Sequence, residues 1–365
     1  MIRKPAPGHK RQGEPPPVAG REWSEMTTTA DNADNADNRA NRLEVTDLSV
    51  GFDLAGGRTA LAVDGVSFAV GAGETLALVG ESGCGKSVTC LAMMRLLPVP
   101  PARLVGGSVK LSGRELTTLS DRRMRQVRGT AMSMIFQEPM TSFDPVYTMG
   151  EQLAEAILAH KSLPPDSPEI TERIHASLDA VGLPDPAGLM NRYPHELSGG
   201  MKQRAMIAMA LLGNPEILLC DEPTTALDVT IQAQIMDLLV RLRDERGMSM
   251  LFITHNLGLV AELARRAAVM YAGRIVETAS VIDLFETPLH PYTRGLLASV
   301  PRLENKVERL AIIPGTVPAL DDRPPGCNFA PRCELAADIC RERDPALEDK
   351  GGGRMCACHF AGKLA

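Results

Sequence analysis

The stretch that decides the fold is residues 75–87, TLALVGESGCGKS. Its apolar opening, Thr75–Val79, predicts a buried strand. Residues 80–87 follow with the spacing G-x-x-x-x-G-K-S, which is the pattern of a phosphate-binding loop. Glycines let the backbone curl so that consecutive N–H groups point at phosphate oxygens. We expect Lys86 to reach the β- and γ-phosphates of a nucleotide and the Ser87 hydroxyl to ligate Mg²⁺.

An apolar-periodic segment follows the loop and predicts a helix that ends at Pro98. The N-terminus of such a helix carries a partial positive charge, which favours phosphate binding there. The alternative is a glycine-rich turn that matches the pattern by accident, and the flanking strand and helix argue against it. The sequence therefore predicts a nucleotide site on an α/β core.

Composition limits the class of protein. The chain has 365 residues with 44% hydrophobic content, enough for two or three domain-sized units. A net charge of −6 and only 4% aromatic residues argue against nucleic acid as the main partner. The sequence has no apolar run of about 18 residues and no apolar region near its N-terminus. We therefore expect no transmembrane helix, no secretory signal, and a location in the cytoplasm.

Residues 1–41 predict a disordered tail, because they are rich in proline, glycine and charge and end in the polar repeat ADNADNADNRAN. Met26 is an alternative start of the chain. Two segments with alternating hydrophobicity follow, Leu43–Asp53 and Ala62–Val70, and predict antiparallel strands. Phe52 is placed either to stack on an adenine ring or to serve as an ordinary strand residue.

A helical region interrupts the strands. Residues 151–192 have helical periodicity broken by prolines, which predicts an inserted helical subdomain. The sequence LSGGMKQR at 197–204 comes next. Its Ser198, followed by Gly199 and Gly200, predicts a second anion-binding helix N-terminus. Because the chain already has a phosphate loop, we expect this terminus to cap the γ-phosphate of a nucleotide held by a partner subunit.

Polar residues end or follow three further predicted strands. Gln137 ends a short strand and is expected to coordinate the metal or position water, with a solvated strand end as the alternative. Asp221 and Glu222 end the strand EILLCDE and are interpreted as a magnesium ligand and a general base, rather than as capping acids. Asp228 follows at a turn that is expected to touch a partner's phosphate loop. His255 follows the strand Met248–Thr254 and is expected to contact the γ-phosphate, although a lone histidine is usually structural.

The eight cysteines are unevenly distributed. Three lie in the nucleotide-binding region and are interpreted as small core or loop residues. Five lie in the last 39 positions, which in a cytoplasmic protein indicates a metal site more than disulfides. Four thiolates at Cys327, Cys333, Cys340 and Cys358 suffice for an iron–sulfur cluster or a zinc site, with reduced structural thiols as the third possibility. Cys356 is then the spare.

Taken together, these motifs resemble the nucleotide-binding subunits of ABC transporters over about residues 43–300, and the LSGG sequence is diagnostic. The resemblance implies a RecA-like P-loop core, an antiparallel β subdomain and an α-helical subdomain at about 138–212. It also implies a head-to-tail dimer that closes on two ATP molecules. Glu222, His255 and Lys86 match the catalytic residues. The residues expected to contact ATP or its Mg²⁺ are Phe52, Gly80, Ser82, Gly83, Cys84, Gly85, Lys86, Ser87, Val88, Gln137, Ser198, Gly199, Gly200, Asp221 and Asp228, with Ser87, Gln137 and Asp221 at the Mg²⁺.

The last third resembles the C-terminal region of oligopeptide and dipeptide importer ATPases, through HPYTRGLL at 290–297, IPGTVPAL and the cysteine-rich segment. The segment EPMTSFDPVYTMGEQL is similar to the D-type subunit of such importers. The resemblance implies domains at 42–300 and 301–365, and a structural [4Fe–4S] cluster on the four cysteines. It also implies an F-type ATPase partner, two permeases and a solute-binding protein, at the cytoplasmic face of the inner membrane. An importer of nickel, glutathione or another small solute, and more distantly a soluble ATPase acting on ribosomes or DNA, are the alternatives.

Overall fold

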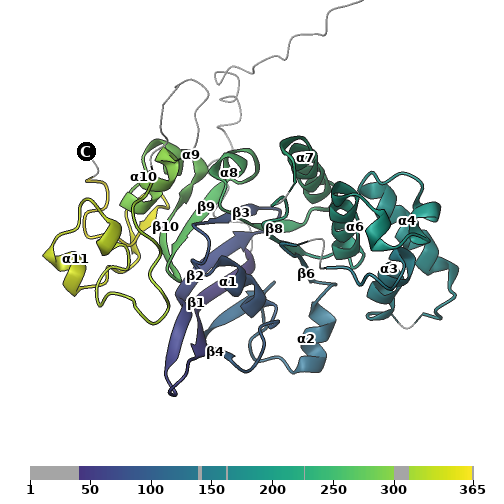
Figure 1. Ribbon diagram of the computed structural model, residues 1–365, viewed down its shortest axis with the longest axis horizontal. Coiled ribbons are helices and arrows are strands. Elements are labelled where there is room, and N and C mark those ends of the chain that lie inside the picture. The colour runs from purple at the N-terminus through teal and green to yellow at the C-terminus, as the bar shows by residue number, and fades with distance from the viewer. Residues whose placement is uncertain (1–40, 139–141, 162, 226, 300–311, 364–365) are drawn as a thin grey trace, which may run out of the picture. The chain divides into compact units, whose positions relative to one another are not determined.

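The computed structural model describes residues 41–138, 142–161, 163–225, 227–299 and 312–363 (Figure 1). These residues belong to one compact unit, Ala40–Ala365. The predicted N-terminal tail lies outside the described residues except for Asn41, which begins the first strand. The boundary near residue 300 also falls outside them, so the predicted domain limits stay predictions.

Four strands form an antiparallel sheet; two of them come before the phosphate loop in the sequence and two come after it. Its strands lie in the order β2-β1-β4-β5. Their sequences alternate in hydrophobicity, so one face of the sheet is buried: Leu43 of β1 pairs with Val70 of β2 and Leu111 of β4, and all three are buried. The bounds are β1 (Asn41–Asp53), β2 (Thr59–Gly71), β4 (Ala102–Leu111) and β5 (Arg114–Glu115).

An eight-stranded mixed sheet forms the core, in the order β11-β12-β10-β9-β3-β8-β7-β6. The five strands from β9 to β6 are parallel, and β10, β12 and β11 extend one edge with antiparallel pairs. Every residue of β3, β6, β7 and β8 is buried, and most are apolar, as expected for parallel strands that are covered on both faces. Their bounds are β3 (Thr75–Val79), β6 (Met132–Ile135), β7 (Ile217–Asp221), β8 (Ser249–Thr254), β9 (Arg266–Tyr271), β10 (Arg274–Ser280), β11 (Glu348–Asp349) and β12 (Met355–Cys356).

The helical subdomain lies beyond β6, where α3, α4 and α6 gather (Figure 1). Thr148 and Glu151 form a capping box at the start of α3, which explains why the helix begins there. Its buried face, with Leu153 and Ile157, joins one hydrophobic cluster with α4 and α6. The bounds are α3 (Met149–Leu158), α4 (Pro168–Ala180), α5 (Pro186–Met190), the 3₁₀ turn η2 (Pro194–Glu196) and α6 (Gly199–Leu211).

The remaining helices flank the two sheets. α7 is the longest of those described and ends at Gly247, whose φ of 62° supplies the left-handed C-cap. The bounds are α1 (Lys86–Met93), α2 (Asp121–Val127), α7 (Val229–Arg246), α8 (Leu257–Leu263), α9 (Val281–Glu286) and α10 (Pro291–Ala298). Within the described ranges, no helix combines the length and apolar character needed to cross a membrane.

Residues 312–363, here called the C-terminal extension, consist mainly of loops. They contain the 3₁₀ turn η3 (Ala330–Arg332), α11 (Asp338–Glu342), β11 and β12. The extension joins the core sheet because Met355 and Cys356 of β12 pair with β10. Phe329 is buried against the rings of Tyr271 and Tyr292. The predicted α/β core with an antiparallel β subdomain and an inserted helical subdomain is confirmed.

Candidate nucleotide-binding site

Parallel strands place the predicted site residues at one edge of the core sheet. β3 leads directly into the phosphate loop, β7 ends at Asp221, and His255 follows the end of β8. Gln137 lies two residues beyond the end of β6. These strands are neighbours and run in the same direction, so their carboxyl ends meet where open α/β sheets bind ligands.

The phosphate loop needs glycine at its last turn. Gly85 has a φ of 109°, which side-chain-bearing residues rarely adopt, and a Cβ there would lie 2.9 Å from the Ala62 carbonyl oxygen. The loop delivers the chain into α1, whose first residue is Lys86. Lys86 Nζ donates hydrogen bonds to the carbonyl oxygens of Gly80, at 2.8 Å, and Glu81, at 2.9 Å. The ammonium is therefore held inside the curve of the loop.

Two side chains with oxygen atoms that can ligate a metal ion lie beside the loop. The Ser87 hydroxyl donates a hydrogen bond of 2.9 Å to Asp221 Oδ1, although the residues are 134 positions apart in the sequence. Burial raises the pKa of Asp221, and the bond from Ser87 opposes that shift. A hydroxyl and a carboxylate oxygen are ligands that suit Mg²⁺, which usually keeps water and substrate phosphates in its shell as well. The pair therefore fits the predicted magnesium site.

Glu222 is the centre of a polar cluster. Its carboxylate accepts hydrogen bonds from Gln137 Nε2 at 3.2 Å and Thr225 Oγ1 at 3.0 Å, and Oε1 lies 3.2 Å from His255 Nδ1. Its backbone has a φ of 45°, a conformation that costs energy for a residue other than glycine. The structure thus brings together three of the predicted residues, Gln137, Glu222 and His255.

The surroundings of Glu222 keep it ionised. Burial raises its pKa, but hydrogen bonds from His255 and Thr225 outweigh this and lower the pKa of the carboxyl below its ordinary value. A carboxylate held by three side chains at the edge of a phosphate site is suited to accept a proton from water.

The LSGG motif begins α6, as expected. Ser198 is the N-cap and accepts a hydrogen bond from the Met201 N–H at 3.3 Å, and the two glycines open the helix. A Cβ at Gly200 would lie 3.2 Å from the side chain of Ile231, close to the start of α7. Asp228 caps α7 by accepting a hydrogen bond from the Ile231 N–H at 2.9 Å. A partner's nucleotide at Ser198 and a partner's loop at Asp228 stay predictions.

The other predicted contact residues lie in or beside the loop. Cys84 is buried, and its Sγ lies 3.7 Å from Lys86 Nζ, while burial raises the pKa of its thiol. Val88 and Phe52 pack, partly buried, against the cluster shared by α1 and the four-stranded sheet. Ser82 and Gly83 form the exposed tip of the loop. Stacking of Phe52 on an adenine ring stays a prediction.

One residue of the loop was not singled out by the motif. Glu81 occupies a variable position of the pattern, yet its carboxylate accepts two hydrogen bonds from Arg332, at 2.6 and 3.0 Å. Its backbone N–H donates a hydrogen bond of 2.8 Å to Tyr292 Oη. No sequence signal indicated these contacts, because the partners are more than 200 residues away.

The predicted metal site at the four cysteines is wrong. Among the described residues, which include all four, no group of three or more histidine, cysteine, aspartate or glutamate side chains is arranged to hold a metal ion. The cysteines line a cavity of only about 10 Å³, enough for about one water molecule. Burial raises the pKa of Cys327 to about 11 and also raises that of Cys333 and Cys358.

The thiols instead serve packing. Cys340 is buried, and Cys327 and Cys333 are partly buried against the cluster that contains Tyr271 and Phe329. The Cys327 N–H donates a hydrogen bond of 2.8 Å to the Cys340 carbonyl oxygen, which brings the two segments of the extension together. This is the third of the possibilities considered, reduced structural thiols, and neither an iron–sulfur cluster nor zinc fits the site.

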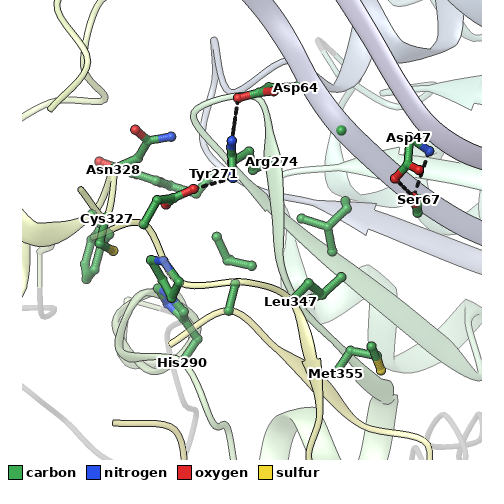
Figure 2. Close-up of a pocket in the computed structure, with 17 residues that line it drawn as sticks. Asp47, Asp64, Ser67, Tyr271, Arg274, His290, Cys327, Asn328, Leu347 and Met355 are labelled. Atoms are coloured by element: carbon green, nitrogen blue, oxygen red, sulfur yellow. Dashed lines mark hydrogen bonds and ion pairs between the residues drawn. The ribbon is translucent and has the colours of Figure 1, made fainter. Parts of the chain in front are cut away.

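A larger cavity of about 400 Å³ lies where the extension meets the core sheets (Figure 2). Arg274 stands at its wall and donates a hydrogen bond of 2.9 Å to Asp64, and it also pairs with Asp344 of the extension. None of the predicted nucleotide-contacting residues lines this cavity. Its walls show how charged side chains tie the extension to the core.

Comparison with known families matches both parts of the chain. Residues 63–225 match the ABC transporter family. Residues 276–340 match the oligopeptide/dipeptide transporter C-terminal region. The first match contains the phosphate loop, Asp221 and Glu222, and the second contains three of the four cysteines. Both parts therefore follow the resemblance noted in the sequence.

Two similar proteins cover most of the chain. An ATP-binding protein from Sinorhizobium fredii, provisionally named for a peptide ABC transporter, is 55% identical over 298 residues, which cover 81% of this chain and 88% of that protein. An ATP-binding protein from Brucella abortus, provisionally named for peptide import, is 50% identical over 316 residues, which cover 87% and 94%.

Solved structures with the same fold are nucleotide-binding cassettes. One is a dimeric ATP-binding cassette in a post-hydrolysis state bound to ADP and phosphate, with a TM-score of 0.58 and 25% identity over 66% of this chain and 98% of that one. Another, from Clostridium perfringens, is part of an ABC transporter complex, with a TM-score of 0.56 and 25% identity over 68% and 92%. The predicted RecA-like core is confirmed by these matches.

Proposed function

This chain belongs to the family of ABC transporter ATP-binding subunits, and on that premise we propose that it hydrolyses ATP to power the import of peptides through a membrane permease. One observation supports the proposal above the others. A region that matches the ABC transporter family and a region that matches the oligopeptide/dipeptide transporter C-terminal region occur in one chain. Relatives named for peptide transport match more than 80% of the chain at 50% identity or above.

The proposed reaction uses the residues at the sheet edge. The loop amides and Lys86 bind and orient the phosphates, and Ser87 and Asp221 would hold Mg²⁺, which when bound would neutralise phosphate charge. Glu222 accepts a proton from the water that attacks the γ-phosphorus, and His255 orients the carboxylate and faces the phosphate. The bond between the γ-phosphorus and the bridging oxygen breaks, and ADP and phosphate result.

A partner completes the site in this proposal. Ser198 and the two glycines that follow it lie at the start of α6, where backbone N–H groups are free of intrahelical partners. A second subunit with the same architecture, arranged head to tail, caps the γ-phosphate with this helix terminus. Closing on ATP and opening after hydrolysis then transmit motion through the helical subdomain and Gln137 to the permease.

We extend the proposal to the assembly. The chain acts as the D-type ATPase of a pair with an F-type ATPase, below two permease subunits that receive solute from a binding protein. It is peripheral to the cytoplasmic face of the inner membrane through those permeases and does not use nucleic acid as a partner. The resemblance of residues 138–153 and of the C-terminal region to such importers supports this arrangement.

The test is to isolate the full chain from gently solubilised membranes and identify its partners. We expect two permeases and a second ATPase, and ATP hydrolysis by this complex that rises when its binding protein is loaded with peptide. Stimulation by nickel or glutathione, with no response to peptides, would overturn the peptide assignment. Recovery with ribosomal or DNA-repair proteins and without membrane subunits would overturn the transporter role.

A further inference from the structure

Glu81 of the phosphate loop is fixed by three different groups. Its N–H donates to Tyr292 Oη at 2.8 Å, and its carbonyl oxygen accepts from Lys86 Nζ at 2.9 Å. Its carboxylate receives two hydrogen bonds from the Arg332 guanidinium, at 2.6 and 3.0 Å. A continuous path of contacts therefore runs from Arg332 in the extension through Glu81 to Lys86.

Arg332 is itself held on every side. Its side chain is only 4% exposed, and Nε donates a hydrogen bond of 2.8 Å to the Pro314 carbonyl oxygen. The guanidinium carbon lies 5.7 Å from the ring centre of Tyr271 and 5.9 Å from that of Phe329. Figure 2 shows Tyr271 beside the extension near Cys327. A side chain confined in this way can fix the position of the carboxylate that it binds.

We propose that Arg332 is a positioning residue for the phosphate loop, so that the C-terminal extension forms part of the ATP site. The bidentate pair sets the position of Glu81, and the Glu81 backbone in turn sets where Lys86 and the loop amides meet the phosphates. The inference rests on ATP binding at the loop, and it does not depend on which solute is transported.

Attachment of the extension does not by itself explain this ion pair. The extension is already joined to the core by the pairing of β12 with β10, by Arg274 with Asp344, and by hydrogen bonds from Arg354 to Thr287. Burying the charge of Arg332 is costly, and apolar packing at the same place often stabilises a fold as well. The distinctive property of the ion pair is geometric, because two parallel N–H···O bonds fix the carboxylate in one orientation.

The experiment compares full-length variants that lose one charge at the joint. Arg332→Gln removes the contact with Glu81, Arg332→Lys keeps the charge without the bidentate geometry, and Glu81→Gln removes the other partner. Arg274→Gln is the matched control, since it breaks an ion pair between extension and core whose side chains do not contact the loop. The dissociation constant for MgATP, KM and kcat are measured for each, together with the thermal unfolding midpoint.

We expect Arg332→Gln to raise the dissociation constant and KM for MgATP by about tenfold, with a smaller change in kcat. Arg332→Lys should recover part of the loss, and Arg274→Gln should bind MgATP like the wild type. The double variant of Arg332→Gln and Glu81→Gln should bind no more weakly than Glu81→Gln alone, because both changes break one contact.

Two results would overturn the inference. One is a folded Arg332→Gln variant with wild-type affinity for MgATP. The other is an equal loss of affinity in Arg274→Gln, which would show that docking of the extension alone matters. If Arg332→Gln does not fold, Arg332→Lys and the Glu81→Gln variant decide by the same measurements. A wild-type chain that does not bind ATP would instead overturn the proposed function.

Discussion

The nucleotide site and the cysteine-rich C-terminal extension both gather polar side chains from separate segments, but only at the nucleotide site do these side chains contact one another around a common centre. At the nucleotide site, Ser87 meets Asp221, and Glu222 meets Gln137 and His255, as expected for one active centre. In the extension, four cysteines line a common small cavity but do not form a metal site. The two regions thus differ in how well residue spacing in the sequence predicts which side chains form a site.

The difference lies in what the spacing constrains. The loop pattern occupies eight consecutive residues between a strand and a helix, so its glycines and lysine lie within one turn of backbone whose N–H groups can point at an anion. The four cysteines are separated by 5, 6 and 17 residues, which leaves their relative positions to the surrounding fold. Four cysteines in separate segments show only that enough metal ligands are present in the sequence. A contiguous loop motif also places its residues next to one another in space.

The largest effect is expected at Glu222, where the sequence prediction is most specific. Replacing Glu222 by Gln keeps the size and shape of the side chain, but it replaces one accepting oxygen by an amide NH2 group and removes the ability to accept a proton. We expect kcat for ATP hydrolysis to fall by roughly 10²- to 10⁴-fold, with binding of MgATP retained. Steady-state hydrolysis and retention of bound ATP measure the two effects.

The matched control for this variant is Glu216→Gln. Glu216 directly precedes the first residue of β7, whereas Glu222 directly follows its last residue. Glu216 forms an ion pair of 2.7 Å with Arg42 and does not contact the polar cluster around Glu222. The Glu216→Gln substitution should therefore leave kcat near the wild-type value. Full turnover by the Glu222→Gln variant would remove Glu222 from the role of base and weaken the first half of the comparison.

A second large effect is expected in the extension, and it concerns stability. Phe329 is 4% exposed and contacts the rings of Tyr271, Tyr292 and His290. Replacing it by alanine should lower the free energy of unfolding by about 3 kcal/mol, because it leaves a cavity in the packing that holds the extension. Chemical denaturation measures this loss.

Leu335→Ala is the control for that loss, since Leu335 is 41% exposed in the same extension and should change stability by less than about 1 kcal/mol. Equal stability of the Phe329→Ala variant and the wild type would mean that something other than aromatic packing holds the extension. The packing of the cysteine side chains would then be the next contact to test.

Much of the fold followed from hydrophobic patterning. The apolar runs Thr75–Val79 and Ile217–Asp221 are central strands, and the alternating segment Leu43–Asp53 lies on the antiparallel sheet. These predictions succeed because period and length are local properties of the chain. The topology of a parallel sheet also explains why Gln137, Glu222 and His255 lie side by side, since it brings the ends of neighbouring strands to one edge.

The contacts that sequence reasoning missed join segments far apart in the chain. Arg332 and Glu81 are 251 residues apart, and neither belongs to a periodic pattern that would indicate the partner. The role of Thr225 as a third donor to Glu222 depends on the left-handed backbone at Glu222. Asp228 was expected to face a partner, and in this chain its carboxylate caps α7. Such details arise from tertiary packing.

A smaller effect should distinguish the electrostatics of the site from its general architecture. Replacing Thr225 by Val removes one hydrogen bond to the Glu222 carboxylate, so the pKa of Glu222 should rise toward the value that burial favours. Glu222 acts as a base only when ionised, and therefore the acid limb of the kcat profile should move to higher pH. At neutral pH we expect a loss of about fivefold or less.

Thr225→Ser restores the hydroxyl and should return the acid limb to its original position. His255, Lys86 and Asp221 also act on the ionisation of Glu222, and they are unchanged in both variants, so the difference between the two profiles reports on the Thr225 bond. An acid limb that stays in place in Thr225→Val would show that this bond does not tune the base.

The smallest expected effect is the sharpest test of the extension, because it is the absence of a change. Burial raises the pKa of Cys327 to about 11, and the cavity that the four cysteines share holds only about 10 Å³. Treatment of the nucleotide-free chain with a strong chelator should leave its unfolding midpoint unchanged, and elemental analysis should find far less than one iron or zinc per chain. Structural metal sites contribute folding energy directly, so their removal lowers stability. If the unfolding midpoint falls on chelation and one metal ion is released per chain, the four cysteines are a metal site. The motifs of both regions would then mark binding sites.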